Sequence, residues 1–187
     1  QLTERWAQQV VIDQRPGAGG IIAAETVARA TPARYTLLLT TGSYTINHTL
    51  HAKLPYDLTR DLAPVALLAT IQFLLSTPPS LPVKSVEELL QMARAQPRKL
   101  NCASSGVGTT AHLGCEMLNQ LGKVNMVHVP YKGLAAAITD LLGGRVELGF
   151  VVMQAGLPYV RSGKLRALAV SGAKRSPSIP ELPTVAE

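Results

Sequence analysis

Aromatic side chains, cysteines and long apolar runs are all scarce in this sequence. Of its 187 residues, 4% are aromatic and two are cysteine, whereas 47% are hydrophobic. No apolar run reaches the roughly 18 residues that a membrane-spanning helix needs, so we expect no direct membrane insertion. The hydrophobic content comes mainly from small and aliphatic side chains, which excludes wholesale disorder and suits helices packed closely on a buried sheet.

Clustered positive charge is also lacking, although the formal net charge is +6. A nucleic-acid-binding domain usually gathers its Lys and Arg on one stripe beside aromatic residues. Here they are scattered singly along the chain, so we expect no nucleic-acid partner. A diffuse positive field raises the encounter rate with anionic ligands, but a solvated basic surface explains the same charge equally well.

The two cysteines are too few for a disulfide framework. Cys102 and Cys115 could pair in an oxidising compartment, but the sequence does not show whether their Cβ atoms face each other. We therefore expect them to be buried free thiols.

The sequence starts without an initiator Met and without a signal peptide. It therefore begins after processing or within a longer chain. The second interpretation is favoured, because residues 1–7 read like the middle of an amphipathic helix.

Strand-like and helix-like segments alternate along the chain, without internal repeats or low-complexity tracts. Strands separated by helical crossovers indicate βαβ units, and hence a parallel sheet with helices on both faces. The expected strands are 10–12, 35–39, 100–103, 124–129, 146–153 and 165–170. Helices are expected at 21–29, 134–142 and 155–162. Two further helices are expected, one starting at a capping box at 85–88 and one starting after Gly108. The segment 62–77 is expected to be extended, because it contains Pro64.

The segment 104–112, Ser-Ser-Gly-Val-Gly-Thr-Thr-Ala-His, is the most informative motif because it follows a strand and opens a helix. Free amides and the helix dipole at such a point make an anion site, to which Ser105, Thr109 and Thr110 add hydroxyls. The two glycines also fit a dinucleotide-binding fingerprint, but the acidic ribose partner expected ~20 residues further on is absent. An ordinary strand–helix turn is the alternative. A second glycine-rich loop, 17–20, also opens a helix, where we favour packing over ligand contact.

Neither a metal site nor a catalytic group is indicated. His112, Cys115 and Glu116 share one helical face, but no second ligand cluster accompanies them. The three other histidines read as isolated surface residues or as histidines with satisfied hydrogen bonds. There is no GxSxG elbow, and acidic residues are sparse near the candidate loops. We therefore expect no metal, no cofactor and no catalytic residue.

These motifs occur together, and in this order, in one family. The chain resembles the periplasmic receptors of the tripartite tricarboxylate transporter family, the Bug-type receptors. The match covers essentially the whole chain and is most specific at 15–20 (Arg-Pro-Gly-Ala-Gly-Gly) and 129–133 (Val-Pro-Tyr-Lys-Gly). Further matching segments are 35–39, 53–57, 61–65, 103–106, 127–128, 140–144, 163–170 and 183–187.

The resemblance implies an α/β fold of two lobes, the type II-like "Venus flytrap" of periplasmic binding proteins, with two crossover strands between the lobes. Residues 1–70 would form part of the first lobe and residues 71–170 the second, while the tail 171–187 would return to the first. Relative to the family, the chain would lack an N-terminal strand and loop and a C-terminal helical segment.

The resemblance also implies a function, that of an exported periplasmic receptor that is not an enzyme. It would bind a small carboxylate (a di- or tricarboxylate, an amino acid or a related acid) in the interlobe cleft and deliver it to the membrane subunits of the transporter. Val151 replaces a polar residue common in the family, which predicts an apolar far end of the pocket. The alternative is a small-molecule-sensing or enzymatic α/β domain that binds an anionic ligand. The ligand-binding candidates implied by the resemblance are Thr41, Gly42, Ser43, Ser105, Gly106, Thr109, Thr110 and Gln154.

Overall fold

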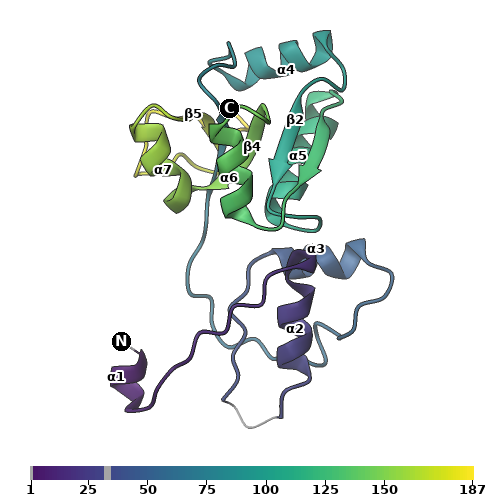
Figure 1. Ribbon diagram of the computed structural model, residues 1–187, viewed down its shortest axis with the longest axis vertical. Coiled ribbons are helices and arrows are strands. Elements are labelled where there is room, and N and C mark those ends of the chain that lie inside the picture. Colours follow the sequence, from purple (N-terminus) through teal and green to yellow (C-terminus); the bar gives the residue numbers. More distant parts are fainter. Residues whose placement is uncertain (1, 32–34) are drawn as a thin grey trace.

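The structure, a computed structural model, describes residues 2–31 and 35–187 in two groups of elements joined by an extended connection (Figure 1). Among the described residues, no helix has both the length and the apolar character that crossing a membrane requires. The first group contains α1 (Leu2–Trp6), a 3-10 turn (Ala18–Gly20), α2 (Ile21–Ala28) and α3 (Ser43–Leu50). The second contains β1 (Phe73–Thr77), α4 (Val86–Ala95), β2 (Asn101–Ser104), α5 (Thr110–Gly122), β3 (Val127–Pro130), α6 (Leu134–Leu142), β4 (Leu148–Val152), α7 (Met153–Arg161) and β5 (Arg166–Val170).

The second group is built on one five-stranded sheet with the order β3-β2-β4-β1-β5. Strand β2 is parallel to both β3 and β4, as βαβ units predict. Strand β1, however, is antiparallel to both β4 and β5, so the expectation of a wholly parallel sheet is wrong. The reason is topological: β1 follows the extended segment 62–72, and no single helical crossover joins it to either neighbour in the sheet.

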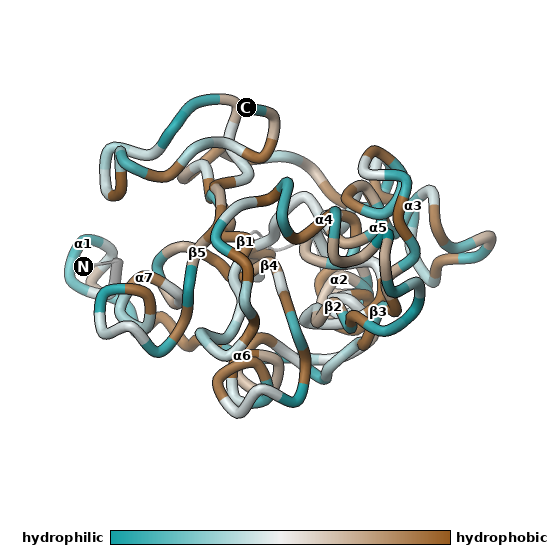
Figure 2. Tube along the Cα trace, turned by 90° about the horizontal axis from the view of Figure 1, so that it is seen from above, coloured by the Kyte–Doolittle hydropathy of each residue, from teal (hydrophilic) through white to brown (hydrophobic). Residues whose placement is uncertain are grey.

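Helices cover both faces of this sheet, as the sequence predicts, and Figure 2 shows the strands side by side between them. The alternation along β1 shows how the layers form. Leu75 packs into the core cluster of α4 and α5, whereas its neighbour Leu74 packs on the opposite face against α7. Both leucines are fully buried, and burying such a side chain contributes about 1.5–3 kcal/mol.

Helix α4 begins at the predicted capping box. The Ser85 hydroxyl accepts a hydrogen bond from the Glu88 amide at 3.1 Å. The Glu88 carboxylate accepts from the amide of Lys84 at 2.6 Å, one residue before the position that a capping box specifies. The helix start is therefore as predicted, and the return bond is shifted by one residue.

Neither strand expected in the first group, 10–12 or 35–39, forms among the described residues. A strand exists only where a neighbouring backbone pairs with it, and no backbone hydrogen bond joins 35–39 to another described residue. Helix α2 is confirmed, and α3 is an addition to the expected elements. A small core cluster forms around Ala24 and Tyr44, with Leu38 packed against it.

The tail was expected to return to the first group. Over 171–187 it instead packs on the second group, where Ile179 and Leu182 join the cluster of Leu74. Thr184 forms an isolated parallel bridge with Val170, the last residue of β5. Apolar tail side chains are thus buried beside the sheet. The division into lobes of residues 1–70 and 71–170 stays a prediction.

A disulfide joins Cys102 on β2 to Cys115 on α5, so the expectation of free thiols is wrong. The two Cα atoms lie 6.0 Å apart, a separation that disulfides commonly span. Both residues are fully buried in the cluster of α4 and α5. The bond therefore fixes α5 covalently to the sheet at the start of the loop that the sequence identifies as a candidate anion site.

Removing this disulfide should lower the free energy of unfolding by about 3 kcal/mol, because a closed loop of this size restricts the unfolded chain. The residues are 13 apart in sequence. We expect Cys102→Ala/Cys115→Ala to unfold at lower urea concentration than the wild type, and reducing agent to shift only the wild type. Two thiols that react with a labelling reagent in urea without reductant would show that the bond is not formed.

Candidate functional site

The parallel strands bring the candidate loops to one edge of the sheet. Because β2, β3 and β4 are parallel, their carboxyl ends lie at the same edge, and the loops that follow start there. The amide of Tyr131, just after β3, donates to the carbonyl of Ser104 at 3.0 Å. Strand β1 is antiparallel, so the extended connection from the first group arrives at this edge too. Ser105 and Gln154 both follow strands that end here.

Helix α5 begins at this edge with Thr109 as its N-cap. The Thr109 hydroxyl accepts from the His112 amide at 3.3 Å and donates to the Gly106 carbonyl at 2.7 Å. Gly106 and Gly108 have φ values of 136° and 77°, which glycine adopts without a steric cost. The hydroxyl of Thr109 is therefore committed to the cap, and the next amide of the helix, that of Thr110, points outward.

The N-terminus of α3 meets the N-terminus of α5, and Figure 1 shows α3 beneath the lower end of the second group. Ser43 Oγ accepts a hydrogen bond from the Thr110 amide at 3.3 Å and another from the Thr41 hydroxyl at 3.2 Å. With both lone pairs engaged, the hydroxyl proton of Ser43 is available to a further acceptor. Each helix N-terminus carries about half a positive charge, so a negative charge placed at this junction would be stabilised.

Asn47, one turn after Ser43, lies at the contact between the two groups, and its hydrogen bond stays within the first group. It is fully buried, and its Nδ2 donates to the Gly19 carbonyl at 2.9 Å. Its Oδ1 lies so close to Gly108 that no Cβ would fit there. Tyr44 donates to the Gly20 carbonyl at 3.1 Å, so this loop packs against α3; its choice between packing and ligand contact stays a prediction. Sequence reasoning missed Asn47, although its spacing places it on the same helical face as Ser43.

The structure brings only some of the eight candidates together. Thr41 and Ser43 lie at the junction with Thr110. The Gly106 amide is already bonded to the hydroxyl of Ser104 at 3.1 Å. Gln154 is exposed at the start of α7 and makes no hydrogen bond to another candidate among the described residues. The contact of any of the eight with a ligand stays a prediction.

The predicted apolar end of the pocket is not found at Val151. This residue is 3% exposed and packs in the core cluster beside Ile138 and Leu141 of α6. Alternation along β4 directs it away from the cleft and into the layer beneath α6. The expectation is therefore wrong for this side chain.

His128 is a hydrogen-bonded histidine, one of the two interpretations that the sequence leaves open, and it also stacks on His112. Their ring centroids are 4.0 Å apart with 24° between the planes, and Glu116 lies 3.7 Å from His112 Nε2. Ligand atoms of these three side chains lie within 4.8 Å of one another, so we tested their fit to a metal ion. Lone pairs lie in the ring planes, and those of nearly parallel stacked rings do not converge. The Gly108 amide also occupies His112 Nδ1 at 3.2 Å. The geometry fits a stacked pair better than a metal site.

Ser104 Oγ lies 2.6 Å from His128 Nε2, a distance typical of a nucleophile and its base. Ser104 is, however, only 1% exposed, so a substrate in the cleft would not reach it. Burial and the neighbouring charge of His112 lower the pKa of His128 to about 4. Near neutral pH the pair is an uncharged hydrogen bond inside the fold.

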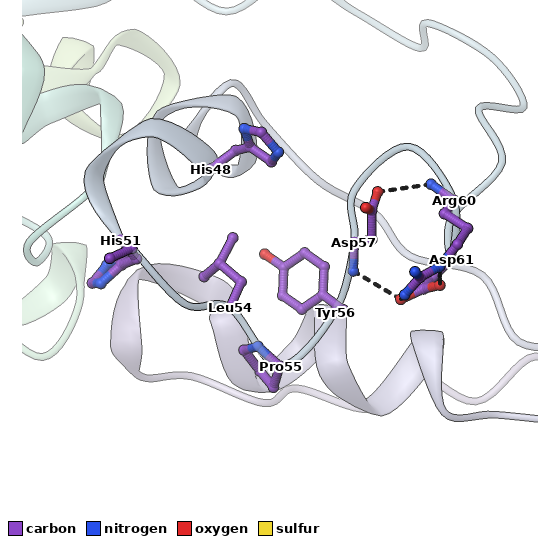
Figure 3. A pocket seen from close by; sticks show the side chains of 9 residues that line it. His48, His51, Leu54, Pro55, Tyr56, Asp57, Arg60 and Asp61 are labelled. Carbon is purple, nitrogen blue, oxygen red and sulfur yellow. Dashed lines mark hydrogen bonds and ion pairs between the residues drawn. The ribbon is translucent and has the colours of Figure 1, made fainter.

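A separate cavity of about 410 Å³ lies in the first group, and Figure 3 shows its lining. None of the eight candidates lines it. Its cation, Arg60, is paired with Asp61 at 2.9 Å, and the Asp57 carboxylate accepts from the backbone amide of Arg60 at 2.9 Å. The buried Tyr56 hydroxyl has no hydrogen-bond partner among the described residues, and burial raises its pKa. Asp57 and Asp61 both line this cavity, and like charges repel, so it is poorly suited to a carboxylate.

Comparison with known proteins points to one family. The model of the tripartite tricarboxylate transporter family receptor matches residues 1–187. The protein BugT of Bordetella pertussis is 37% identical over 190 residues, covering 100% of this chain and 58% of BugT. A protein of R. palustris, solved with adipate, is 40% identical with a TM-score of 0.94 over 99% of this chain and 62% of its own.

A second solved structure is MatC of Rhodopseudomonas palustris with bound malate. It is 31% identical with a TM-score of 0.92, covering 99% of this chain and 63% of MatC. The chain thus spans somewhat more than half the length of the curated relatives it matches.

The stacked histidines predict a pH-dependent stability. The unfolded chain protonates His128 near pH 6.5, whereas the folded protein resists protonation down to about pH 4. Stability from this residue is therefore complete above pH 6.5 and is lost as the pH falls towards 4. We expect the melting temperature to fall over that window, and to fall less in His128→Gln. The groups that face the His128 ring are His112 and Ser104. Glu116→Gln serves as the control, because Glu116 contacts His112 and not His128. Equal slopes in wild type and His128→Gln would contradict this prediction.

Proposed function

The chain belongs to the tripartite tricarboxylate transporter receptor family, and from this premise we propose that it is the ligand-binding part of a periplasmic receptor for a small carboxylate. One observation carries the proposal: the N-termini of α3 and α5 meet, and the Thr110 amide at that junction already bonds an oxygen acceptor, Ser43 Oγ. A ligand carboxylate offers the same type of acceptor with a full negative charge.

The chemistry of the junction favours a carboxylate bound by dipoles. Its groups are backbone amides and hydroxyls, from Thr41, Ser43 and Thr110. Hydrogen bonds of such groups to a charged acceptor contribute about 1.5–3 kcal/mol each. The two helix N-termini add their positive ends. An anion can therefore be bound here without a paired lysine or arginine and can be released again to a transporter.

The ligands of the solved relatives are consistent with this chemistry. One was solved with adipate and the other with malate, and both ligands are dicarboxylates. We propose that this chain takes an acid of the same class, with one carboxylate at the junction of α3 and α5.

The wider setting follows from the family and from the disulfide. A disulfide in a small α/β domain persists in an oxidising compartment, which supports export to the periplasm. We propose that the complete receptor delivers its ligand to membrane subunits of the transporter and does not turn it over. The buried position of Ser104 supports the absence of a reacting nucleophile at the junction.

Replacing Ser43 should weaken carboxylate binding. Ser43→Ala removes the hydroxyl that faces the junction, and we expect the dissociation constant for adipate or malate to rise about tenfold or more. Isothermal titration calorimetry of the 187-residue chain would measure it.

The matched control is Ser85→Ala, which removes the N-cap hydroxyl of α4 outside the candidate site. We expect it to cost about 1 kcal/mol of stability and to leave the dissociation constants unchanged. If both variants bind as tightly as the wild type, Ser43 is not in the site. If adipate, malate and other small acids all fail to bind the wild type, the proposed ligand class is wrong.

A further inference from the structure

The loop between β2 and α5, residues 105–109, has little of its own to hold it in one shape. We call it the glycine loop. Its two glycines have φ values of 136° and 77°, and glycine loses more conformational freedom on folding than any other residue. The loop nevertheless fits the first group closely. A Cβ at Gly108 would collide with Asn47 Oδ1, and a Cβ at Gly19 would lie 2.6 Å from the carbonyl oxygen of Val107. A loop with so close a fit needs other contacts to keep its shape.

His112 supplies one of these contacts, at Gly108. The Gly108 amide donates to His112 Nδ1 at 3.2 Å, so Nδ1 carries no proton and the proton of the neutral ring is on Nε2. The Glu116 carboxylate lies 3.7 Å from Nε2, and a negative charge on that side favours the same tautomer. Gly108 is buried, so its amide has little access to water as a substitute acceptor.

His128 supplies a second contact, at Gly106, through Ser104. The Ser104 hydroxyl oxygen accepts from the Gly106 amide at 3.1 Å and lies 2.6 Å from His128 Nε2. The two histidine rings stack with their centroids 4.0 Å apart, so each ring restricts the position of the other. Both glycine amides of the loop are therefore held by one unit, which joins β2, β3 and α5.

We propose that His112 and His128 are positioning residues of the anion site, which hold the glycine loop in the shape that presents the start of α5 to a ligand carboxylate. The proposal rests on the proposed function and adds the side chains that prepare its site. Neither histidine touches the ligand in this role. A loop that is ordered beforehand loses less conformational entropy on binding, so the pair raises the affinity without adding a contact.

Two substitutions at His112 separate its hydrogen bond from its stacking. The Oδ1 of His112→Asn is three bonds from Cα, as Nδ1 is in histidine, so it can accept from the Gly108 amide although the ring is lost. His112→Phe keeps a ring and loses the acceptor. We expect the dissociation constant for adipate or malate, measured by calorimetry on the 187-residue chain, to rise about tenfold in His112→Phe. It should stay within about threefold of the wild type in His112→Asn.

The corresponding pair at His128 is His128→Gln and His128→Leu. The amide end of glutamine is four bonds from Cα, as Nε2 is in histidine, so His128→Gln keeps a partner for the Ser104 hydroxyl and should bind like the wild type. His128→Leu removes that partner. We expect a smaller loss than in His112→Phe, about threefold, because Ser104 can still donate to the Gly106 carbonyl at 3.1 Å.

The control for lost stability is Ser85→Ala, since the Ser85 hydroxyl caps α4 and does not contact the glycine loop. It should lower the melting temperature and leave the dissociation constant unchanged. If His112→Phe does not fold, the unaltered protein supplies the test. Nitrogen-15 NMR reports the tautomer of His112, and we expect Nδ1 without a proton and Nε2 with one.

Four results would overturn the proposal. Equal affinity of His112→Phe and the wild type would show that the pair supports only the fold, and the proposed function would still stand. Equal losses in His112→Asn and His112→Phe would show that the bond to Gly108 does not set the affinity. A proton on His112 Nδ1 in the wild type would show that this bond is not formed. A wild type that binds no small acid would remove the proposed function itself, and this role with it.

Discussion

A backbone amide that is buried away from water needs a hydrogen-bond acceptor. This constraint decides which segments of the chain form paired strands and a buried core. In the second group it is met strand by strand, since β2 and β1 each have a neighbour on both sides. The buried sheet in turn gives α4 to α7 a surface on which to pack. In the first group the same kind of sequence is present at 10–12 and 35–39, but the acceptors are not. The apolar side chains there stay exposed for the same reason.

The same constraint acts at the helix ends, and there it produces a candidate for function. Ser85 and Thr109 each bond an amide of their own helix, at 3.1 and 3.3 Å. Ser43 differs, because its oxygen bonds the Thr110 amide of a helix in the other group. Because the acceptor of the Thr110 amide comes from another element, a ligand oxygen could replace it without disturbing the cap of α5. The proposed anion site and the contact between the groups thus share the same few atoms.

Local signals in the sequence were sufficient for much of this. The capping box at Ser85, the turn before Thr109 and the extended segment 62–77, which ends in β1, each depend on a few neighbouring residues, and the structure has each of them. Features that depend on contacts between distant segments could not be predicted from the sequence. The direction of β1, the pairing of Cys102 with Cys115 and the stacking of His128 on His112 depend on which segments meet. Alternation in a sequence predicts which faces of a strand are apolar but not which strands lie beside it, and 35–39 pairs with no strand among the described residues.

At the contact between the groups, Oδ1 of the fully buried Asn47 lies so close to Gly108 that a side chain larger than that of glycine would not fit there. At the same contact, the Thr110 amide bonds a neutral hydroxyl, that of Ser43. Hydrogen bonds to an ionised acceptor are roughly twice as strong as neutral ones. Under the proposed function, a carboxylate that takes the place of that hydroxyl would therefore strengthen the contact between the groups. It has only to replace one acceptor, and Ser43 can turn its proton towards the ligand.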